Sequence, residues 1–548
     1  MNVRMSKDAS LSTPASAIAV DPATLPDDLS TCHQLIRDLL DAIEKGTQLN
    51  QRLQHQLDAL LRARFGKKSE KLNPNQLLLF AKEMLDQEPA PSSETSAEEA
   101  APSNTNRKST GRKPLPRNLP RKRIEYDIPA EEKACPCCGE ERTRIGTDTS
   151  EQLEYVPASM LVIEHVRFKY ACKHCQENVT TAPKPPQPIE KGLAAPGLLA
   201  HVITSKYADH LPLYRLEGIF ARHGVEISRK TTCDWVAACA DLVEPIYQRM
   251  AERIKLSRVI HTDATTVPVQ EKGSSKTKKA YLSPYIGDAD HPLTVFDYTE
   301  TYTRDGPLAF LEGFQGYLQA DAHSTYDELY KTGAIQEVAC WAHARRKFFD
   351  AKTTDPTRAH VALAMIGELY AIEREAAERM AKVEEATDSP LAHERAYADR
   401  YQFRQEHALG KLQRLKAWLT EEQRRALPKS PIGEAISYAL NHWEALCRYT
   451  EQGYLAIDNN IAERAIKNVV IGRKNWLFAG SDEGGHTAAV LFSLTVTCKT
   501  LGIDPFAYLR DVLTRLPLLI AEVKDPAEIR QHPTLDELLP DRWKAQQE

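Results

Sequence analysis

The sequence has no long hydrophobic run. None of its apolar stretches approaches the roughly 18 consecutive residues that a membrane-spanning helix needs. The N-terminal stretch, MNVRMSKDASLS, also lacks the apolar core of a secretory leader. We therefore expect a protein that has no membrane partner and stays in the cytoplasm.

An excess of basic residues is also missing. The 71 lysines and arginines are outnumbered by 76 acidic residues, and the resulting net charge of −5, taken alone, argues against a nucleic-acid-binding protein. Charge is uneven along the chain, however, because residues 107–123 hold eight basic residues and no acidic one. The prolines in this segment prevent a helix. Two interpretations stay open: an extended strand that follows DNA phosphates or enters a minor groove, and a solvated tether.

Cysteine is too scarce for a disulfide scaffold. The chain has 11 cysteines in 548 residues, and its apolar fraction of 42% and charged fraction of 27% are ordinary for a globular protein. Collagen-like repetition and wholesale disorder are excluded as well. At about 100–200 residues per domain, the length predicts several domains.

Four of the cysteines form two C-x-x-C pairs with the spacing of a metal site. The pairs lie within CPCCGE and CKHC, and each tight turn presents two thiolates to one ion. The segment between them suits a β-hairpin, so we predict a zinc-ribbon-like module with a structural Zn²⁺. The predicted ligands are Cys135, Cys138, Cys172 and Cys175. A redox dithiol and buried free cysteines are the alternatives.

A heptad pattern near the N-terminus predicts a coiled coil. Within residues 29–64, apolar residues recur at two seam positions, interrupted by one Asn and one Gly. The seams are Ile36, Ile43, Asn50 and Leu57, and Leu39, Gly46, Leu53 and Leu60. A single Asn at such a seam favours a parallel two-stranded pair, so we expect a homodimer or a higher oligomer. The alternative is an amphipathic helix packed on its own chain.

A helix pair within residues 193–250 resembles a DNA-binding arrangement. HGVEI separates an apolar helix from a second helix, which begins after Ser228 and carries Arg229 and Lys230 in its first turn. This layout is typical of a helix-turn-helix whose second helix enters a major groove. Both basic residues are therefore candidates for DNA binding. Many helix pairs share the layout, so packing without DNA contact is equally open.

Residues 257–342 switch to strand patterns that contain two notable acidic residues. Asp263 lies within the β-branched stretch 258–270, and Asp321 ends the strand GYLQAD. A buried carboxylate is costly unless a partner such as a divalent cation compensates it. Three antiparallel strands, a helix, a strand, a helix and a strand follow in the order of an RNase H-like core, whose first and fourth strands are neighbours. The alternatives are a satisfied polar residue for Asp263 and a turn residue for Asp321.

A third acidic residue would come from far along the chain. Glu463 lies in the first turn of a helix predicted to begin near Asp458, where it would face the sheet. Three such carboxylates could hold two magnesium ions for phosphodiester cleavage and strand transfer. The alternative is specific: Asn460 and Glu463 have the spacing of a capping box, in which the Glu only satisfies the helix N-terminus.

At these positions the sequence resembles a known family. HTDATTVPV, LQADAHSTYDELY, CWAHARRKF and DNNIAERAIKNVVIGRKNWLFAGSDEGG are similar to motifs of the DDE transposases of the insertion sequence 66 group. LRARFGKKSEKLNPNQLLLF, the two cysteine motifs and SKYADHLPLYRLEGIFARHGVEISRKTTCDWV resemble the parts of that family that precede the core. The resemblance covers nearly the whole chain, apart from about the first 28 residues and residues 343–430.

The resemblance implies that Asp263, Asp321 and Glu463 are the catalytic acids and bind Mg²⁺ or Mn²⁺. It implies a helical insertion before the Glu463 helix, with Trp341 near its start as a DNA contact or a core residue. It also implies DNA partners, both terminal inverted repeats and target DNA, a nucleoid-associated protein, and small accessory proteins as potential partners. Cations near Glu463 become candidates for phosphate contacts, with a solvated helix face as the alternative. They are Arg464, Lys467, Arg473 and Lys474.

The predicted fold is multidomain α+β, with an RNase H-like α/β catalytic core. The predicted parts are a disordered tail (1–28), the coiled-coil helix and following motif (29–86), the basic linker (87–123), the zinc module (124–182), the helical DNA-binding segment (193–250), the core (257–342 and 455–500), its helical insertion (343–450) and a C-terminal helical region (501–548). The predicted function is metal-dependent DNA cleavage and strand transfer by a transposase. A non-catalytic zinc-containing DNA-binding regulator and a nuclease without joining activity are the competing hypotheses.

Overall fold

A computed structural model of the chain describes residues 28–46 without 35, 42, 44 and 45, residues 160–170 and 180–181, and residues 184–547 without 272, 275, 387–391 and 524–525. The chain divides into two compact units. The first comprises residues 1–87, 184–221 and 226–548, and the second comprises residues 88–183 and 222–225. The predicted basic linker, the four predicted zinc ligands and most of the predicted coiled coil lie outside the described residues.

The N-terminal helix is present where the heptad pattern predicts it. Each described residue from 29 to 41 is helical. Hydrogen bonds from Ser30 and Thr31 to the Asp28 carboxylate cap this helix and lower the pKa of Asp28 to about 2. Ile36 and Ile43, which share one seam, are 53% and 64% exposed. Pairing of this seam with another copy of the chain stays a prediction.

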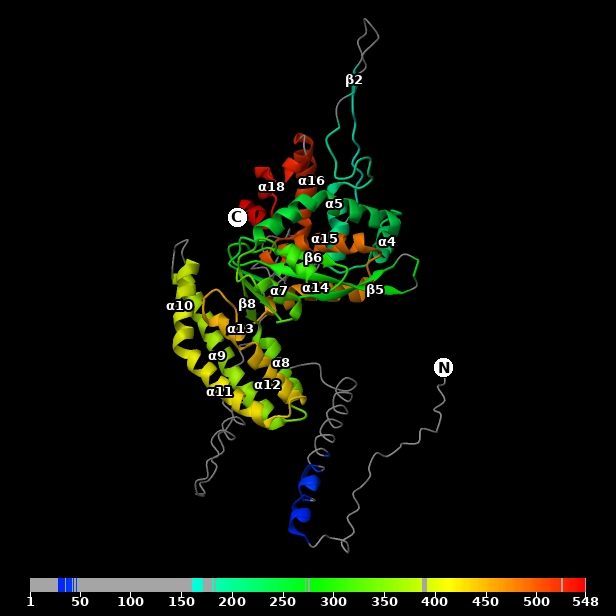
Figure 1. The fold of residues 1–548 in the computed structure, drawn as a ribbon. Coiled ribbons are helices and arrows are strands. Elements are labelled where there is room, and N and C mark those ends of the chain that lie inside the picture. The colour runs from blue at the N-terminus through cyan, green and yellow to red at the C-terminus, as the bar shows by residue number, and fades with distance from the viewer. Residues whose placement is uncertain are drawn as a thin grey trace, which may run out of the picture. The chain divides into compact units, whose positions relative to one another are not determined.

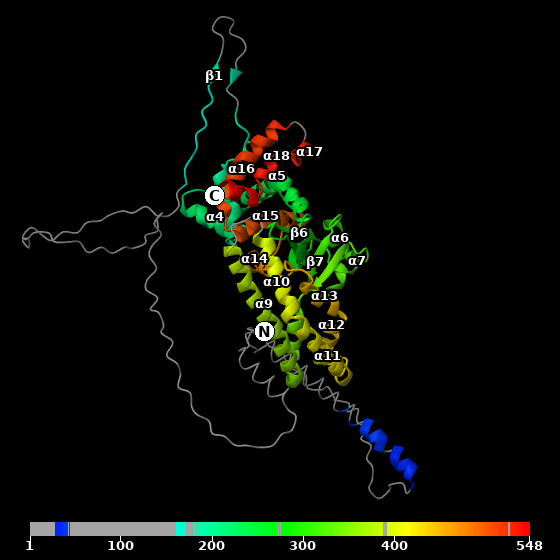
Figure 2. The same cartoon turned by 90° about the vertical axis from the view of Figure 1, so that its left-hand side faces the viewer.

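In the second unit, two short strands flank the second cysteine motif in the sequence. Strand β1 (Lys169–Tyr170) pairs antiparallel with β2 (Thr180–Thr181), and Lys169 lies opposite Thr181. Figures 1 and 2 show this strand pair in cyan. A β-hairpin whose turn contains CKHC requires that the strands before and after the motif pair with each other, as β1 and β2 do.

Six strands of the first unit form one mixed sheet. Along the sheet, β6 pairs with β5, β5 pairs with both β3 and β4, β3 pairs with β7, and β7 pairs with β8. The pairings of β3 with β7 and of β7 with β8 are parallel, and the others are antiparallel. The strands are β3 (Val259–Thr262), β4 (Thr265–Gln270), β5 (Thr277–Ile286), β6 (Thr294–Thr299), β7 (Gly316–Ala320) and β8 (Ile335–Ala339).

The helices of the first unit fall into two groups, which Figure 1 shows around the sheet and beside it. The first group is α3 (Pro196–Tyr207), α4 (Leu213–Arg222), α5 (Arg229–Ile254), α6 (Asp305–Phe310), η3 (Ser324–Tyr326), α7 (Asp327–Tyr330), α14 (Asn460–Trp476), α15 (Asp482–Leu501), α16 (Pro505–Glu522), α17 (Pro526–Ile529), α18 (Pro533–Glu537) and α19 (Pro540–Gln547). The second group follows β8 and comprises α8 (Trp341–Ala351), α9 (Pro356–Ala386), α10 (Ala392–His407), α11 (Leu409–Arg425), α12 (Pro431–Asn441), α13 (Trp443–Cys447) and η4 (Arg448–Thr450).

The predicted strand through residues 258–270 is wrong in one respect. It is interrupted at Asp263 and Ala264, which separate β3 from β4. The Asp263 carboxylate accepts a hydrogen bond of 2.7 Å from the Ala264 amide, and this local bond competes with ladder pairing. Asp263 therefore follows a strand directly instead of lying inside one.

Helices α5 and α15 cover the β6 edge of the sheet. One edge of β6 has no partner strand among the described residues, and an unpaired strand edge leaves backbone groups unsatisfied. Ser493 and Thr497 of α15 accept hydrogen bonds from the Phe296 and Thr294 amides at 2.8 and 3.0 Å. Tyr247 of α5 donates to the Phe296 carbonyl at 3.0 Å. Side-chain hydroxyls thus replace a neighbouring strand.

The second helix of the predicted helix-turn-helix begins at the predicted residue. The Ser228 hydroxyl accepts a hydrogen bond of 3.1 Å from the Thr231 amide and so caps α5. Gly224, in the preceding turn, has a φ of +76°, which glycine adopts without strain. Trp235 is buried, whereas Arg229 and Lys230 are exposed. The cap is confirmed, and contact of this helix with DNA stays a prediction.

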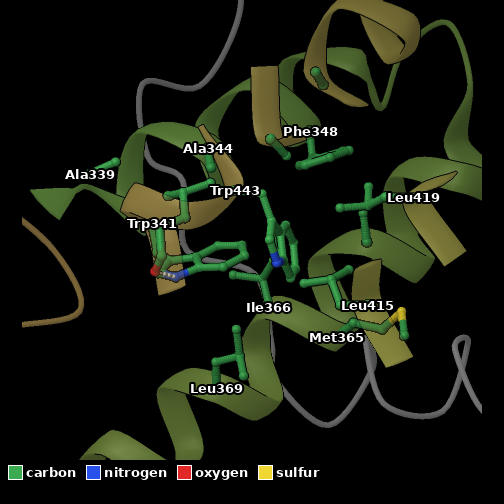
Figure 3. Packing of buried hydrophobic residues seen from close by; sticks show 14 of the residues in the cluster. Ala339, Trp341, Ala344, Phe348, Met365, Ile366, Leu369, Leu415, Leu419 and Trp443 are labelled. Carbon is green, nitrogen blue, oxygen red and sulfur yellow. Dashed lines mark hydrogen bonds between the residues drawn. The ribbon is translucent and has the colours of Figure 1, made fainter. Parts of the chain in front are cut away.

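The helical insertion packs around two tryptophans, as Figure 3 shows. Trp341 is fully buried, and its Nε1 donates to the Leu446 carbonyl at 2.7 Å. Its ring meets that of Trp443 edge-on, with 5.9 Å between the ring centroids. The surrounding side chains include Ala344, Phe348, Met365, Ile366, Leu369, Leu415 and Leu419. A buried indole is not free to contact DNA, so the core-packing alternative holds for Trp341.

A buried ion pair joins α9 to α10. Arg404 is fully buried, and its Nε and Nη2 donate to the two Glu373 carboxylate oxygens at 2.8 and 2.7 Å. The guanidinium also donates to the carbonyls of Tyr449, Gln452 and Leu455 at 2.6, 2.8 and 2.9 Å. Because these carbonyls lie on the connection from the insertion to α14, one side chain holds that connection in place.

Replacement of Arg404 by Met should destabilise the protein strongly. The change leaves the buried Glu373 carboxylate with Arg400, at 2.6 Å, as its remaining ion-pair partner and leaves three carbonyls without this donor. Loss of one partner of a buried pair costs about 3–5 kcal/mol. We expect the free energy of unfolding, measured by urea denaturation and circular dichroism, to fall by that amount. Arg379→Met is the matched control, because Arg379 also joins α9 to α10, through Asp399 at 2.8 Å, but at the surface. Equal losses in both variants would contradict the special role of Arg404.

Candidate active site

Asp263 and Asp321 leave the sheet at the same edge. Strands β3 and β7 are parallel neighbours, and His261 lies opposite Gln319. Asp263 and Asp321 each follow two residues later. Because the carboxyl ends of parallel strands meet at one edge of a sheet, the two acidic residues occupy equivalent positions there.

The pKa of Asp263 is influenced by the other two acidic residues. Burial raises this pKa to about 6, and the charges of Asp321 and Glu463 act in the same direction. The hydrogen bond from the Ala264 amide and the nearby His343 act in the opposite direction. None of the groups that dominate this pKa is a lysine or an arginine. The charges that raise the pKa of Asp263 are therefore those of two other carboxylates.

Asp321 is held by its own turn and by the insertion. Its Oδ1 accepts a hydrogen bond of 3.1 Å from the His323 amide, and Ala322 between them has a φ of +59°, which is uncommon for a residue with a Cβ. The Asp321 carbonyl accepts a hydrogen bond of 3.0 Å from the hydroxyl of Tyr438, a residue of α12. The helical insertion therefore contacts the backbone of this acidic residue directly.

Glu463 does not serve in a capping box. The residue that precedes α14 is Asn459, whose side chain makes no capping hydrogen bond, and Asn460 is already helical. The Asn460 amide nitrogen Nδ2 instead donates to Asp458 at 2.7 Å. The Glu463 carboxylate lies 3.7 Å from His343 Nε2 and remains 42% exposed. The capping interpretation is wrong, and the carboxylate points to the same neighbourhood as Asp263.

Two further residues border the acids. His343, in the first turn of α8, has an Nδ1 that is buried without a hydrogen-bond partner among the described residues. Tyr302, after β6, stacks on Tyr281 with 4.9 Å between ring centroids. Burial raises the pKa of Tyr302 to about 12, and the charges of Asp321 and Asp263 contribute. His343 lies within the motif CWAHARRKF, whereas no sequence pattern singled out Tyr302.

The predicted cations of α14 divide into two kinds. Arg464, Lys467 and Lys474 are exposed along the helix that carries Glu463. Arg473 instead donates to the Thr265 and Thr266 hydroxyls at 3.0 and 3.1 Å, and to the Thr266 carbonyl. The Arg473 guanidinium thereby fastens α14 to β4, so this side chain already has a structural role.

The donor chemistry of the acids fits a hard divalent cation. Carboxylate oxygens are the ligands that Mg²⁺ prefers and that suit Mn²⁺. No group of three or more His, Cys, Asp or Glu side chains is close enough together to hold an ion within the part of the chain that the structure describes. Asp263, Asp321 and Glu463 would therefore have to approach one another to share an ion.

Sequence models of one family match most of the chain. The model described as "Transposase IS66 family" matches residues 191–487, and "zinc-finger binding domain of transposase IS66" matches residues 132–176. "Transposase C of IS166 homeodomain" matches residues 52–124, and "IS66 C-terminal element" matches residues 493–540. None of the described helices is long and apolar enough to cross a membrane.

Similar proteins occur in Sinorhizobium fredii (strain NBRC 101917 / NGR234). One, named "Uncharacterized protein y4jD", is 35% identical over 79% of this chain and 82% of its own length. Another, "Uncharacterized protein y4qI", is 37% identical over 72% of this chain and 71% of its own length. The similarity therefore extends well beyond the sheet and its acidic residues.

The raised pKa of Asp263 predicts that Asp263→Asn stabilises the protein at neutral pH. The folded pKa of about 6 lies above the ordinary value of 3.8, so folding favours the protonated carboxyl. Stability is therefore lost as the pH rises from about 4 to 6, on the order of 3 kcal/mol, and an amide avoids this loss. In calorimetry with a chelator, we expect a higher unfolding midpoint than wild type at pH 8 and no gain at pH 4.

Asp297→Asn is the matched control for this measurement. Burial also raises the pKa of Asp297 to about 6, but this residue lies on β6, near His486 of α15. The control should show the same pH-dependent gain. Added Mn²⁺ should stabilise wild type and Asp297→Asn and leave Asp263→Asn unchanged. A gain for Asp263→Asn that is the same at pH 4 and pH 8 would contradict the assigned pKa.

Proposed function

The chain belongs to the IS66 family of transposases, and we propose that it is a DDE-type enzyme that cleaves DNA at the ends of an insertion sequence and joins the freed 3′-hydroxyls to target DNA. The observation that carries this proposal is geometric: Asp263 and Asp321 follow parallel neighbouring strands at one sheet edge, and the Glu463 carboxylate lies beside His343, which also acts on the pKa of Asp263. A transposase role by itself follows from the family.

The proposed core is RNase H-like. The strand order β6, β5, β3 with β4, β7 and β8 supports this assignment, because β5 lies antiparallel to its neighbours and β3, β7 and β8 run parallel. In this interpretation, β3 and β4 together form the first strand, interrupted at Asp263. The insertion between β8 and α14 then comprises the helices from α8 to α13 together with η4.

The proposed ligands of Mg²⁺ or Mn²⁺ are the three acids. Two such cations stabilise the attacking and leaving oxygens of an in-line phosphodiester displacement. Asp263 and Asp321 come from the rigid sheet edge, and Glu463 comes from a helix end that is fastened to the same sheet. No side chain of this site needs to form a covalent bond with DNA.

DNA would approach along the exposed side of α14. Arg464, Lys467 and Lys474 follow Glu463 on that helix and are exposed, so phosphates next to the cleaved bond can contact them. Arg229 and Lys230, at the exposed start of α5, are the proposed contacts of the helix-turn-helix. These cations supply the local positive charge that the net charge of −5 conceals.

Cleavage of element-end DNA tests the proposal. Wild type with Mg²⁺ or Mn²⁺ should nick labelled DNA that carries the terminal repeats and join it to a target plasmid. Asp263→Asn should reduce both products by at least about 10³-fold, since the cation loses a ligand that the transition state requires. Asp297→Asn, equally buried but on β6, should cleave and join like wild type.

The competing functions predict different products. A non-catalytic regulator would bind the terminal DNA and leave it intact, and a nuclease without joining activity would release nicked DNA but no joined plasmid. Joining by Asp263→Asn at the wild-type rate would disprove the proposed catalytic role of this residue.

The zinc module (residues 124–182) is proposed to hold a structural Zn²⁺ through Cys135, Cys138, Cys172 and Cys175. The match of residues 132–176 to the zinc-binding part of the family supports this, and the cysteines lie outside the described residues. Elemental analysis should find about one Zn²⁺ per chain in wild type and a clear loss in Cys172→Ser. Cys233→Ser, at an exposed free cysteine, should keep the zinc. Equal zinc content in both variants would contradict the assignment.

A further inference from the structure

Asn459 lies fully buried directly before α14, the helix that carries Glu463. A buried primary amide is costly unless its polar atoms have partners. Each polar group of Asn459, in the side chain and in the backbone, has one. All of these partners belong to residues at or next to the acidic site.

The Asn459 side chain holds the end of β3. Its Nδ2 donates to the Thr262 carbonyl at 2.7 Å, and Thr262 directly precedes Asp263. Its Oδ1 lies 3.2 Å from His261 Nδ1. Because an amide oxygen can only accept, His261 Nδ1 carries the proton of this hydrogen bond. The amide nitrogen and the amide oxygen of Asn459 thus bond to two adjacent residues of β3, Thr262 and His261.

The Asn459 backbone holds the start of α14. Its carbonyl accepts hydrogen bonds from the amides of Ala462 and Glu463 at 3.1 and 3.3 Å. Its own amide donates to Cys340 Sγ at 3.1 Å, at the junction of β8 and α8. One residue therefore connects the peptide before Asp263 to the peptide of Glu463, although the two acids lie far apart in the sequence.

We propose that Asn459 is a positioning residue, which fixes the backbone at Glu463 relative to the backbone before Asp263. It thereby keeps the two carboxylates within reach of a shared divalent cation and sets the affinity of the acidic site for that ion. This inference rests on the proposed function, in which these acids bind the cation. Asn459 contacts neither carboxylate and acts only through β3 and α14. Asn suits the position because an ionised Asp cannot donate to the Thr262 carbonyl and an apolar side chain can neither donate nor accept.

Asn459→Asp tests this role in the full-length protein. The substitution keeps the shape of the side chain, but an ionised Asp has no donor for the Thr262 carbonyl, so the hydrogen bond between the end of β3 and the start of α14 is lost. Calorimetric titration with Mn²⁺ should show an affinity weaker by about 10- to 100-fold, the range typical of residues that orient metal ligands. Binding of terminal DNA without divalent cation should equal that of wild type. Titration of Asp263→Asn identifies which Mn²⁺ belongs to the acidic site.

Asn468→Asp is the matched control on the same helix. Asn468 is also buried, and its Nδ2 donates to the Ala465 carbonyl while its Oδ1 accepts from Lys499 at 3.1 Å, so it has no link to β3. Its Mn²⁺ affinity should equal that of wild type. A residue that only stabilises the fold would change the unfolding midpoint but leave the Mn²⁺ affinity of the folded protein unchanged.

A pair of His261 variants tests the same link independently, should Asn459→Asp not fold. His261→Leu removes the donor to Asn459 Oδ1 and should weaken Mn²⁺ binding. His261→Asn keeps an amide nitrogen near the place of Nδ1 and should restore most of the affinity. Equal affinity in the two His261 variants would overturn the proposal.

The outcomes separate this inference from the proposed function. If wild type binds no Mn²⁺ that Asp263→Asn loses, the proposed function fails. If wild type binds such an ion and Asn459→Asp binds it with the same affinity, the positioning role is wrong and the proposed function stands.

Discussion

The parallel pairing of β3 with β7 is the constraint on which the site depends. It brings the carboxyl ends of two strands to one edge of the sheet. Asp263 and Asp321 therefore occupy equivalent positions, two residues after the paired His261 and Gln319. A shift of this register by one residue would turn one of the two side chains to the opposite face. Glu463 reaches the same neighbourhood only because α14 is held to the sheet, through Asn459 at its start and Arg473 near its end.

The helical insertion is a structural part of this site. Its α12 reaches the Asp321 carbonyl through Tyr438, and its buried Arg404 holds the connection that leads to α14. At the start of the insertion, the Trp341 amide donates to the Ile457 carbonyl at 3.1 Å, just before α14 begins. Each contact lies within a few residues of an acid or of the helix that carries one. The insertion therefore contributes to the geometry of the acids as well as to the size of the protein.

Negative charge gathers at the three acids, whereas exposed positive charge lies on the neighbouring surface of α14. Burial and the charges of Asp321 and Glu463 raise the pKa of Asp263, and the Ala264 amide and His343 act in the opposite direction. Arg464, Lys467 and Lys474 stand exposed on the same helix as Glu463. The negative acids suit a divalent cation, and the positive surface beside them suits the negatively charged DNA backbone. The net charge of the whole chain carries no information about this local separation of charge.

The sequence by itself determined local features, namely the strand and helix pattern of the core and the Ser228 cap. Its motifs also singled out the three acids that are proposed to bind the cation. Only the tertiary structure decided the interruption at Asp263, the burial of Trp341, the rejection of the capping box at Glu463, and the surroundings that include Tyr302, Tyr438 and Asn459. The reason is physical. Periodicity and caps depend on residues a few positions apart, whereas the contacts of Trp341, Tyr438 and Asn459 join segments over a hundred residues apart and leave no pattern in the chain. The interruption at Asp263 and the start of α14 depend on local hydrogen bonds that compete with other local arrangements, which the sequence pattern allows as well.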